Sequence, residues 1–207
     1  MNYAPWLFCG VLALLVGQVY FLGRRMSEPE KMIRRTTLNP QVQAEIDRYA
    51  EWLKSVQLEQ RTTFQFGSIL VSVFQQKDQP RYLSFMFHQR LSWCVESYLE
   101  DLTILDTTNS GSPDLFPRPG AYKQNFPGIS VQEIWRHHLE GESQLSKKFG
   151  FDWRPINRPY EELLAGAMRI RMNHNRSQSL WPFRVLFRYF VTGRRHYNQS
   201  IQRRFPL

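Results

Sequence analysis

The chain has 207 residues, of which 42% are hydrophobic and 14% aromatic, and it carries a formal net charge of +9. This composition excludes a disordered polyelectrolyte, and the length is sufficient for one globular domain with its own core beside a short N-terminal segment. The only cysteines are Cys9 and Cys94, so there is no disulfide framework, which indicates a reducing compartment.

The first predicted element is a membrane-spanning helix. Residues from Pro5 and Trp6 to Leu22 contain no charged side chain, and a helix of this length extends about 27 Å, close to the hydrocarbon thickness of a bilayer. The pair Arg24-Arg25 follows the segment, and no small-residue cleavage site ends it, which favours a retained signal-anchor over a cleaved signal peptide. Basic residues beside a span stay on the cytoplasmic side. We therefore expect a single-pass protein of a bacterial inner membrane, or of another plasma or organelle inner membrane, with its C-terminal domain on the cytoplasmic or matrix side.

After a basic linker over residues 26–38, residues 39–207 are expected to form one mainly helical domain. Asn39-Pro40 is typical of a helix N-cap followed by proline at the first helical position. An apolar stripe then predicts a helix of about 20 residues. The stripe consists of Val42, Ile46, Tyr49, Leu53 and Val56. We expect it to pack inside the domain, with pairing to another chain as the alternative.

Two apolar stretches follow. Residues 64–74 fit a strand as well as a helix, and their flanks, which are not turn-like, favour the helix. Beyond Pro80, apolar residues at helical spacing predict a long amphipathic helix over residues 81–105. The predicted fold class is therefore mainly α, with one N-terminal transmembrane helix followed by a helical soluble domain. An α+β domain with a small strand element near residues 64–74 is the variant of this prediction.

The remaining predicted elements are a proline-rich loop over residues 106–128 and helices over residues 131–148, 160–173 and 181–192. The first of these helices begins at a capping box, Ser130-x-x-Glu133. Gly141 lies in the middle of the same helix and is expected to weaken it.

The net charge is concentrated at the C-terminal end of the chain. Residues 1–153 contain as many acidic as basic side chains, whereas residues 154–207 contain 11 arginines, no lysine and only Glu161 and Glu162. Aromatic residues are interleaved with these arginines. The candidate partner- or lipid-binding residues are Arg169, Arg171, Arg176, Arg184, Arg188, Arg194, Arg195, Arg203 and Arg204. They suit anionic lipid headgroups, an acidic protein surface or, less well, nucleic acid, and a solvated basic face is the plain alternative.

No catalytic or cofactor-binding motif occurs in the sequence. It lacks a phosphate-binding loop, a dinucleotide-binding glycine pattern and a nucleophile elbow. His137 and Glu140 are three residues apart, but no motif supplies the further ligands that a metal site needs. Glu96, Glu100 and Asp101 are expected to form a solvated acidic face of a helix. We therefore predict no catalytic residue, no metal and no cofactor.

These features together predict a non-catalytic membrane subunit or adaptor of a larger membrane-associated complex, of the secretion, conjugation or respiratory-assembly type. In this hypothesis other protein subunits dock on the helical domain, and residues 154–207 bind an acidic partner or the lipid surface. A membrane-tethered nucleic-acid-binding protein is the first alternative. An enzyme of a class that the sequence does not reveal is the second. The sequence leaves the organism, the identity of the complex and the oligomeric state open.

Overall fold

The chain divides into two compact units. The computed structural model describes residues 17–18, 32–35, 38, 40–88, 90–110, 118–181, 183–184 and 200–206. The larger unit consists of Glu30–Ser112, Pro119–Ala167 and His196–Leu207, and the smaller unit consists of Met1–Pro29, Pro113–Arg118 and Met168–Arg195. The larger unit contains the sheet and most of the described helices.

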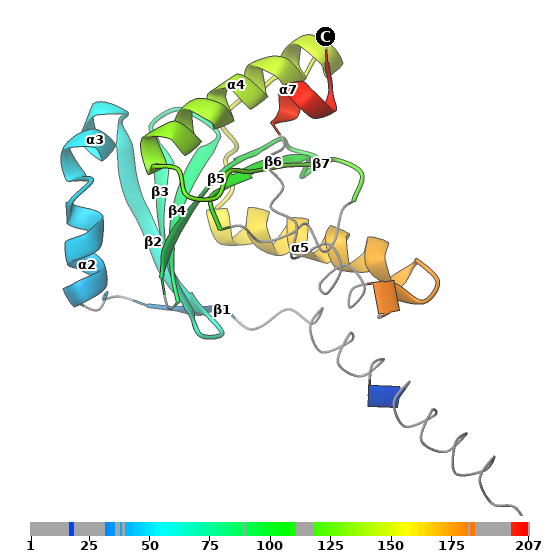
Figure 1. Ribbon diagram of the computed structural model, residues 1–207, viewed down its shortest axis with the longest axis horizontal. Coiled ribbons are helices and arrows are strands. Elements are labelled where there is room, and N and C mark those ends of the chain that lie inside the picture. The colour runs from blue at the N-terminus through cyan, green and yellow to red at the C-terminus, as the bar shows by residue number, and fades with distance from the viewer. Residues whose placement is uncertain are drawn as a thin grey trace, which may run out of the picture. The chain divides into compact units, whose positions relative to one another are not determined.

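A seven-stranded sheet forms the centre of the larger unit (Figure 1). Its strands are β1 (Met32–Arg34), β2 (Leu58–Phe66), β3 (Ile69–Gln76), β4 (Arg81–Phe87), β5 (Leu91–Tyr98), β6 (Ile104–Thr108) and β7 (Ala121–Asn125). They follow one another across the sheet in chain order. Every neighbouring pair is antiparallel except β6 and β7, which are parallel. The short antiparallel connections explain why residues 58–108 form a contiguous sheet.

Helices cover both faces of this sheet. The described helices are α2 (Pro40–Asp47), α3 (Ala50–Ser55), α4 (Val131–Phe149), α5 (Tyr160–Arg176) and α7 (Ile201–Arg204). Helices α2, α3 and α4 pack on one face, and the first half of α5, up to Ala167, packs on the opposite face. Helix α7 lies beside the C-terminal half of α4 (Figure 1).

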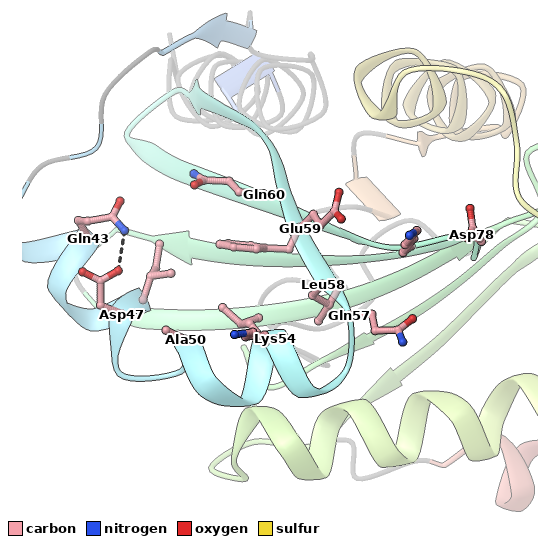
Figure 2. Close-up of a pocket in the computed structure, with 13 residues that line it drawn as sticks. Gln43, Asp47, Ala50, Lys54, Gln57, Leu58, Glu59, Gln60 and Asp78 are labelled. Atoms are coloured by element: carbon pink, nitrogen blue, oxygen red, sulfur yellow. Dashed lines mark hydrogen bonds between the residues drawn. The ribbon is translucent and has the colours of Figure 1, made fainter.

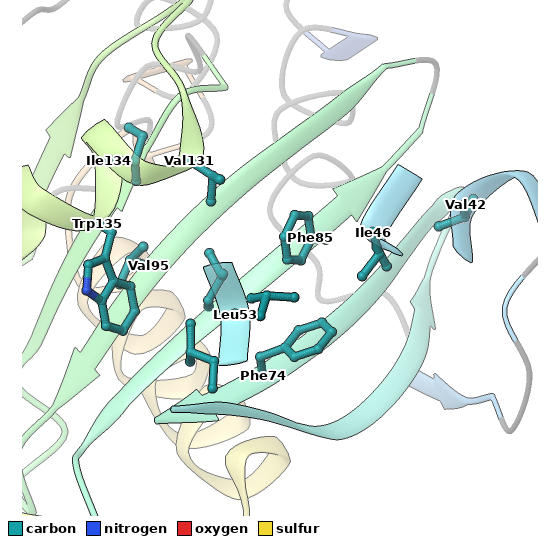
Figure 3. Packing of buried hydrophobic residues seen from close by; sticks show 11 residues of the cluster. Val42, Ile46, Leu53, Phe74, Phe85, Val95, Val131, Ile134 and Trp135 are labelled. Carbon is teal, nitrogen blue, oxygen red and sulfur yellow. The ribbon is translucent and has the colours of Figure 1, made fainter. Parts of the chain in front are cut away.

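The largest apolar cluster lies under α2, α3 and the start of α4. Figure 3 shows Ile46 and Leu53 of the two short helices directed at Phe74 and Phe85 of the sheet. On the opposite face Tyr82, Tyr98, Tyr160 and Leu163 pack with the valines of β3. A third cluster, around the fully buried Leu105, Leu145 and Ile201, joins α4 and α7 to the far end of the sheet.

The prediction of a mainly α fold is wrong, because the described chain is α+β: a seven-strand mixed sheet packed against helices. Residues 81–105, predicted as one helix, form β4, β5 and the beginning of β6. The helical spacing is misleading because helices cover both sides of these strands. In β4, Leu83 packs toward α2–α4 while Tyr82 packs toward α5. A strand that is buried on both faces carries apolar residues at nearly every position and fits a period of 3.6 as well as one of 2.

The helix expected over residues 64–74 is also wrong. This segment contains the β2–β3 hairpin, in which the chain turns at Gly67 with φ of +59°. The loop expected over residues 106–128 contains the end of β6 and all of β7. The single helix expected from Pro40 is divided into α2 and α3 near Tyr49.

Helix α4 confirms the prediction made from its capping box. The Ser130 hydroxyl accepts a hydrogen bond from the Glu133 backbone N–H at 3.2 Å, and the Glu133 carboxylate accepts one from the Ser130 N–H at 2.9 Å. The helix ends at Gly150, which adopts the left-handed conformation with φ of +70°.

The predicted membrane segment, Pro5–Leu22, lies outside the described residues except for residues 17 and 18. Among the residues that the structure does describe, no helix combines the length and the apolar character needed to cross a bilayer. Membrane attachment through residues 5–22 therefore stays a prediction from the sequence.

Candidate functional site

The structure places the predicted arginines in two groups. Arg169 and Arg176 are exposed on the second half of α5, seven residues and therefore two turns apart, and Arg171 is half-buried. Arg184 is exposed and donates from Nη1 to Gln178 Oε1 at 2.7 Å. These four belong to the smaller unit. Arg188, Arg194 and Arg195 lie outside the described residues.

The second group, on the larger unit, forms a surface that combines cations with aromatic rings. Arg203 and Arg204 are exposed on α7, which packs against the end of α4, where Lys147 and Lys148 are exposed. Between these cations lies Phe149, 43% exposed. We call Lys147, Lys148, Phe149, Arg203, Arg204 and Phe205 the basic–aromatic patch. Of these residues, only Arg203 and Arg204 were predicted from the sequence, because about fifty residues separate the two lysines from them along the chain.

Aromatic stacking holds the centre of the patch in place. The Phe149 ring lies 5.6 Å from that of Phe205, 5.8 Å from Tyr122 and 5.5 Å from Phe151, measured between centroids. The Arg204 guanidinium lies 5.5 Å from the centroid of Phe205. It also donates from Nη1 to the Lys123 carbonyl at 2.9 Å. Such ring pairs contribute about 0.5–1.5 kcal/mol each beyond their burial, so they stabilise the position of Phe149 in the patch.

Within the described part of the chain, no ion pair involves Lys147, Lys148 or Arg203. The nearby carboxylate of Asp152 pairs with Arg154 at 2.6 Å. Lysines in the last turn of a helix also complement the helix dipole, which is the plain reading of Lys147 and Lys148. That reading does not account for the arginines of α7 beside them.

A buried polar network lies between α4 and the sheet. The His138 ring places Nε2 at 2.8 Å from Ser97 Oγ and Nδ1 at 2.9 Å from Thr107 Oγ1. Ser97 Oγ donates to Glu142 Oε1 at 2.5 Å, and Glu142 Oε2 pairs with Arg81 Nη2 at 2.7 Å. Burial raises the pKa of the Glu142 carboxyl, but its hydrogen bond to His138 and its pairing with Arg81 outweigh burial and lower the pKa to about 2.

Serine, histidine and carboxylate side chains in mutual contact are the components of a nucleophilic triad, but this set lacks the arrangement that a triad needs. Ser97 and His138 are both fully buried. The Ser97 hydroxyl donates to the Glu142 carboxylate, so its proton is not directed at the histidine. A fully satisfied network of this kind fixes how α4 sits on the sheet.

The opposite face of β5 carries a second polar cluster, which the sequence analysis missed. Glu96 is not on a solvated helix face but on β5, partly buried, where its Oε2 accepts from Tyr160 at 2.6 Å and from Tyr98 at 3.2 Å. Burial, together with the Asp106 carboxylate opposite, raises the pKa of Glu96 to about 7. The Cys94 thiol donates to Asp106 Oδ1 at 2.8 Å, and burial raises its pKa well above the ordinary value. An undissociated thiol is a poor nucleophile.

Metal ligands do not assemble in the described residues. His137 Nδ1 lies 3.1 Å from Glu140 Oε2, as their spacing predicts, but His137 stacks on Phe126 with centroids 4.3 Å apart. No group of three or more histidine, cysteine or acidic side chains in the described residues is arranged to hold a metal ion.

A cleft of about 650 Å³ opens between α2–α3 and the strands β2 and β3 (Figure 2). Its floor is apolar and includes Ile46 and Phe74, which are nearly buried. Its rim carries charges of both signs, namely Asp47, Lys54, Glu59, Lys77 and Asp78. Because these charges nearly cancel, the cleft favours no particular charged ligand.

Comparison of the chain with protein-family models, with curated proteins and with solved structures gave no match. Among the described residues, the basic–aromatic patch is the surface with the most definite chemistry.

Proposed function

We propose that this protein is a non-catalytic, membrane-attached docking subunit of a larger complex, and that its Arg-rich C-terminal part binds an acidic surface. The observation that carries the proposal is the convergence of Lys147 and Lys148 with Arg203 and Arg204 around an exposed phenylalanine. Four cations close together near a membrane contribute about 1 kcal/mol each toward anionic headgroups.

Anionic lipid is the acidic surface that these observations favour. Phe149 provides an apolar ring between the cations, and residues with this combination settle at the boundary between headgroups and acyl chains. The smaller unit repeats the combination, since Ile170 and Leu180 are 38% and 70% exposed on a segment that carries Arg169 and Arg176. The predicted membrane attachment through residues 5–22 would hold the chain close to the headgroups.

The test is vesicle co-sedimentation of the full chain. Wild type is compared with a variant in which Lys147, Lys148, Arg203 and Arg204 are all Gln, on neutral vesicles and on vesicles with 30% phosphatidylserine. We expect wild type to prefer the anionic vesicles by about 100- to 1,000-fold at low salt, and the preference to fall as salt is raised. The variant should lose most of this preference.

The matched control removes four exposed cations elsewhere on the larger unit, with Arg48, Lys54, Lys77 and Arg90 changed to Gln. This control should keep the preference for anionic vesicles. Equal losses in both variants would show that net charge alone matters and would contradict the proposal. Wild-type binding to a polyglutamate peptide but not to anionic vesicles would identify an acidic protein surface as the partner instead.

Nucleic acid is the second candidate, favoured by one feature, the exposed ring of Phe149. Base stacking on an aromatic side chain contributes about 1–3 kcal/mol per base. Binding of a 20-nucleotide single strand at 0.15 M salt, weakened tenfold or more in Phe149→Ala, would support this function. Retention of that binding in Phe149→Ala would exclude stacking on the patch.

The subunit part of the proposal is tested by purifying the tagged full chain from its native membrane in mild detergent and measuring its native mass. A stoichiometric complex with other proteins supports a docking subunit. A lone chain of 24.7 kDa in its detergent belt would contradict it.

A further inference from the structure

Half of the cations of the basic–aromatic patch come from a short segment at the C-terminal end of the chain. Ser200–Pro206 contributes Arg203 and Arg204, whereas Lys147 and Lys148 belong to α4. The chain leaves the larger unit at Ala167 and returns to it at His196. The segment makes contacts of its own with the larger unit.

Those contacts are mostly uncharged and lie beneath the patch. The Ile201 side chain is 0% exposed and packs with Leu105 and Leu145. The backbone N–H of Ile201 donates to Gln124 Oε1 at 2.8 Å, and Gln144 Nε2 donates to the Phe205 carbonyl at 2.8 Å. Lys148 reaches the Pro206 carbonyl through its ammonium group. The core thus binds the backbone of Ser200–Pro206 and one apolar side chain, and leaves Arg203 exposed at the surface.

Gln124 is the central residue among those that hold Ser200–Pro206 on the larger unit. It is fully buried, and its Nε2 donates to Thr107 Oγ1 at 3.0 Å and to the His137 carbonyl at 3.1 Å. These two bonds fix the amide so that Oε1 is directed at the Ile201 N–H. A residue with no charge and no exposure therefore determines where Arg203 and Arg204 lie.

Gly141 explains how α4 accommodates this amide. A Cβ atom at Gly141 would lie 2.5 Å from Gln124 Nε2 and 3.3 Å from Leu105 Cδ2. The glycine in the middle of α4, which the sequence analysis treated as a weak point of the helix, is the residue that lets Gln124 reach the helix backbone.

We propose that Ser200–Pro206 is a strap whose docking assembles the anion-binding patch, with Gln124, Gly141 and Ile201 as positioning residues. The inference rests on the proposed function, since it concerns the same surface. When the strap is seated, four cations share one surface, and when it is released only the two lysines of α4 remain there. Anion binding and strap docking are then linked, so each strengthens the other by the same factor.

The test uses variants that change no charge. Gly141→Ala and Ile201→Ser should each weaken the binding of the full chain to vesicles with 30% phosphatidylserine by about 30-fold, since two of the four cations are no longer held in the patch. Amide hydrogen exchange should become faster at residues 201–205 in both variants. Gly166→Ala is the matched control, because its Cβ would lie 2.6 Å from Leu102 Cδ1, away from the strap. It should lower stability without weakening vesicle binding.

Wild-type protein provides a second measurement that needs no variant. If docking and binding are linked, anionic vesicles should slow amide exchange at residues 201–205 by the same factor by which the strap variants lose affinity. Neutral vesicles should not slow it.

The outcomes separate the strap from the proposed function. If amide exchange shows that residues 201–205 are released in Ile201→Ser but vesicle affinity is unchanged, the strap is overturned. The proposed function still stands in that case, provided that removal of the four cations weakens binding. Unslowed exchange in wild type on anionic vesicles would also overturn the strap. If removal of the four cations has no effect on binding, the proposed function and the strap both fail.

Discussion

Two glutamates on opposite sides of one sheet have pKa values that are shifted in opposite directions. Glu142 reaches β5 at Ser97, where Arg81 and His138 stabilise its charge, and its pKa falls to about 2. Glu96, the residue before Ser97, points to the other face and has no cation as its direct partner, and its pKa rises to about 7. Burial opposes ionisation at both sites.

The two sites differ in the groups that offset the cost of burying a carboxylate. On the α4 face a guanidinium lies 2.7 Å from the carboxylate. On the α5 face Lys123 pairs with Asp106 at 3.3 Å. Glu96 accepts hydrogen bonds from the hydroxyls of Tyr98 and Tyr160, and these bonds together with the charge of Lys123 lower its pKa less than burial and Asp106 raise it. Hydrogen bonds from neutral donors lower a carboxyl pKa less than an ion pair does in the same setting. The charged form of Glu142 is therefore the one that the first cluster stabilises, whereas the second cluster leaves the pKa of Glu96 raised to about 7.

The largest expected effect comes from removing the compensating cation. Arg81→Met leaves Glu142 charged and buried without its guanidinium partner, and should lower the free energy of unfolding at pH 7 by about 3–5 kcal/mol. Denaturant unfolding of the full chain measures it. Arg48→Met, which removes an arginine with an exposed side chain, should cost less than about 0.5 kcal/mol. A loss below about 1 kcal/mol in Arg81→Met would show that Glu142 is not held as a carboxylate.

Lowering the pH should have opposite effects on the contributions of Glu142 and Glu96 to stability. The folded pKa of Glu142 lies below the ordinary value, so its ionised form stabilises the fold above about pH 4.5, and about 3 kcal/mol of stability is lost as pH falls through about 2. Glu142→Gln should remove this dependence on pH between 4.5 and 2. Unfolding curves over that range measure it, and equal slopes in variant and wild type would contradict the low pKa.

Glu96 should give the reverse pattern at higher pH. Its folded pKa lies above the ordinary value, so its contribution is fully present below pH 4.5 and is lost as pH rises through about 7. Glu96→Gln should therefore be about 1–3 kcal/mol more stable than wild type at pH 8 and no more stable at pH 4. If the gain is the same at both pH values, it arises from packing rather than from ionisation.

The smallest expected losses of stability come from replacing one serine in each of the two polar clusters. Ser97→Ala removes the donor to Glu142 and a partner of His138, both buried, and should cost about 1–2 kcal/mol. Ser84→Ala removes only a 3.3 Å contact with the Tyr160 hydroxyl, which keeps Glu96 as its partner, and should cost about 0.5 kcal/mol. Thermal unfolding of both variants at pH 7 measures the difference, and the reverse order would contradict the stronger coupling on the α4 face.

Much of what lies close together in sequence could be predicted. The capping box at Ser130 and Glu133 correctly placed the start of α4, because its two hydrogen bonds join residues only three positions apart. Proline at residue 40 correctly marked the start of α2. The arginines of α7 were recognised as exposed candidates, since a C-terminal stretch almost without acidic residues has few partners to neutralise it.

The candidate site could be predicted only in part. Lys147 and Lys148 join Arg203 and Arg204 only because Ile201 and Gln124 hold the C-terminal segment against α4. Glu96 could not be recognised as a buried carboxyl while residues 81–105 read as a helix, because helical spacing placed it beside Glu100 and Asp101 at the surface.

Local signals in the sequence therefore decide the starts of α2 and α4, the position of the net charge and the lack of a disulfide framework, since each depends on residue type or on neighbours within one turn. Tertiary structure decides everything that depends on which face of a strand a side chain occupies. Glu96 and Ser97 are adjacent in sequence and lie on opposite sides of the sheet, and only the packing of α4 on one side and α5 on the other determines that one of the two glutamates is charged and the other takes up a proton near pH 7.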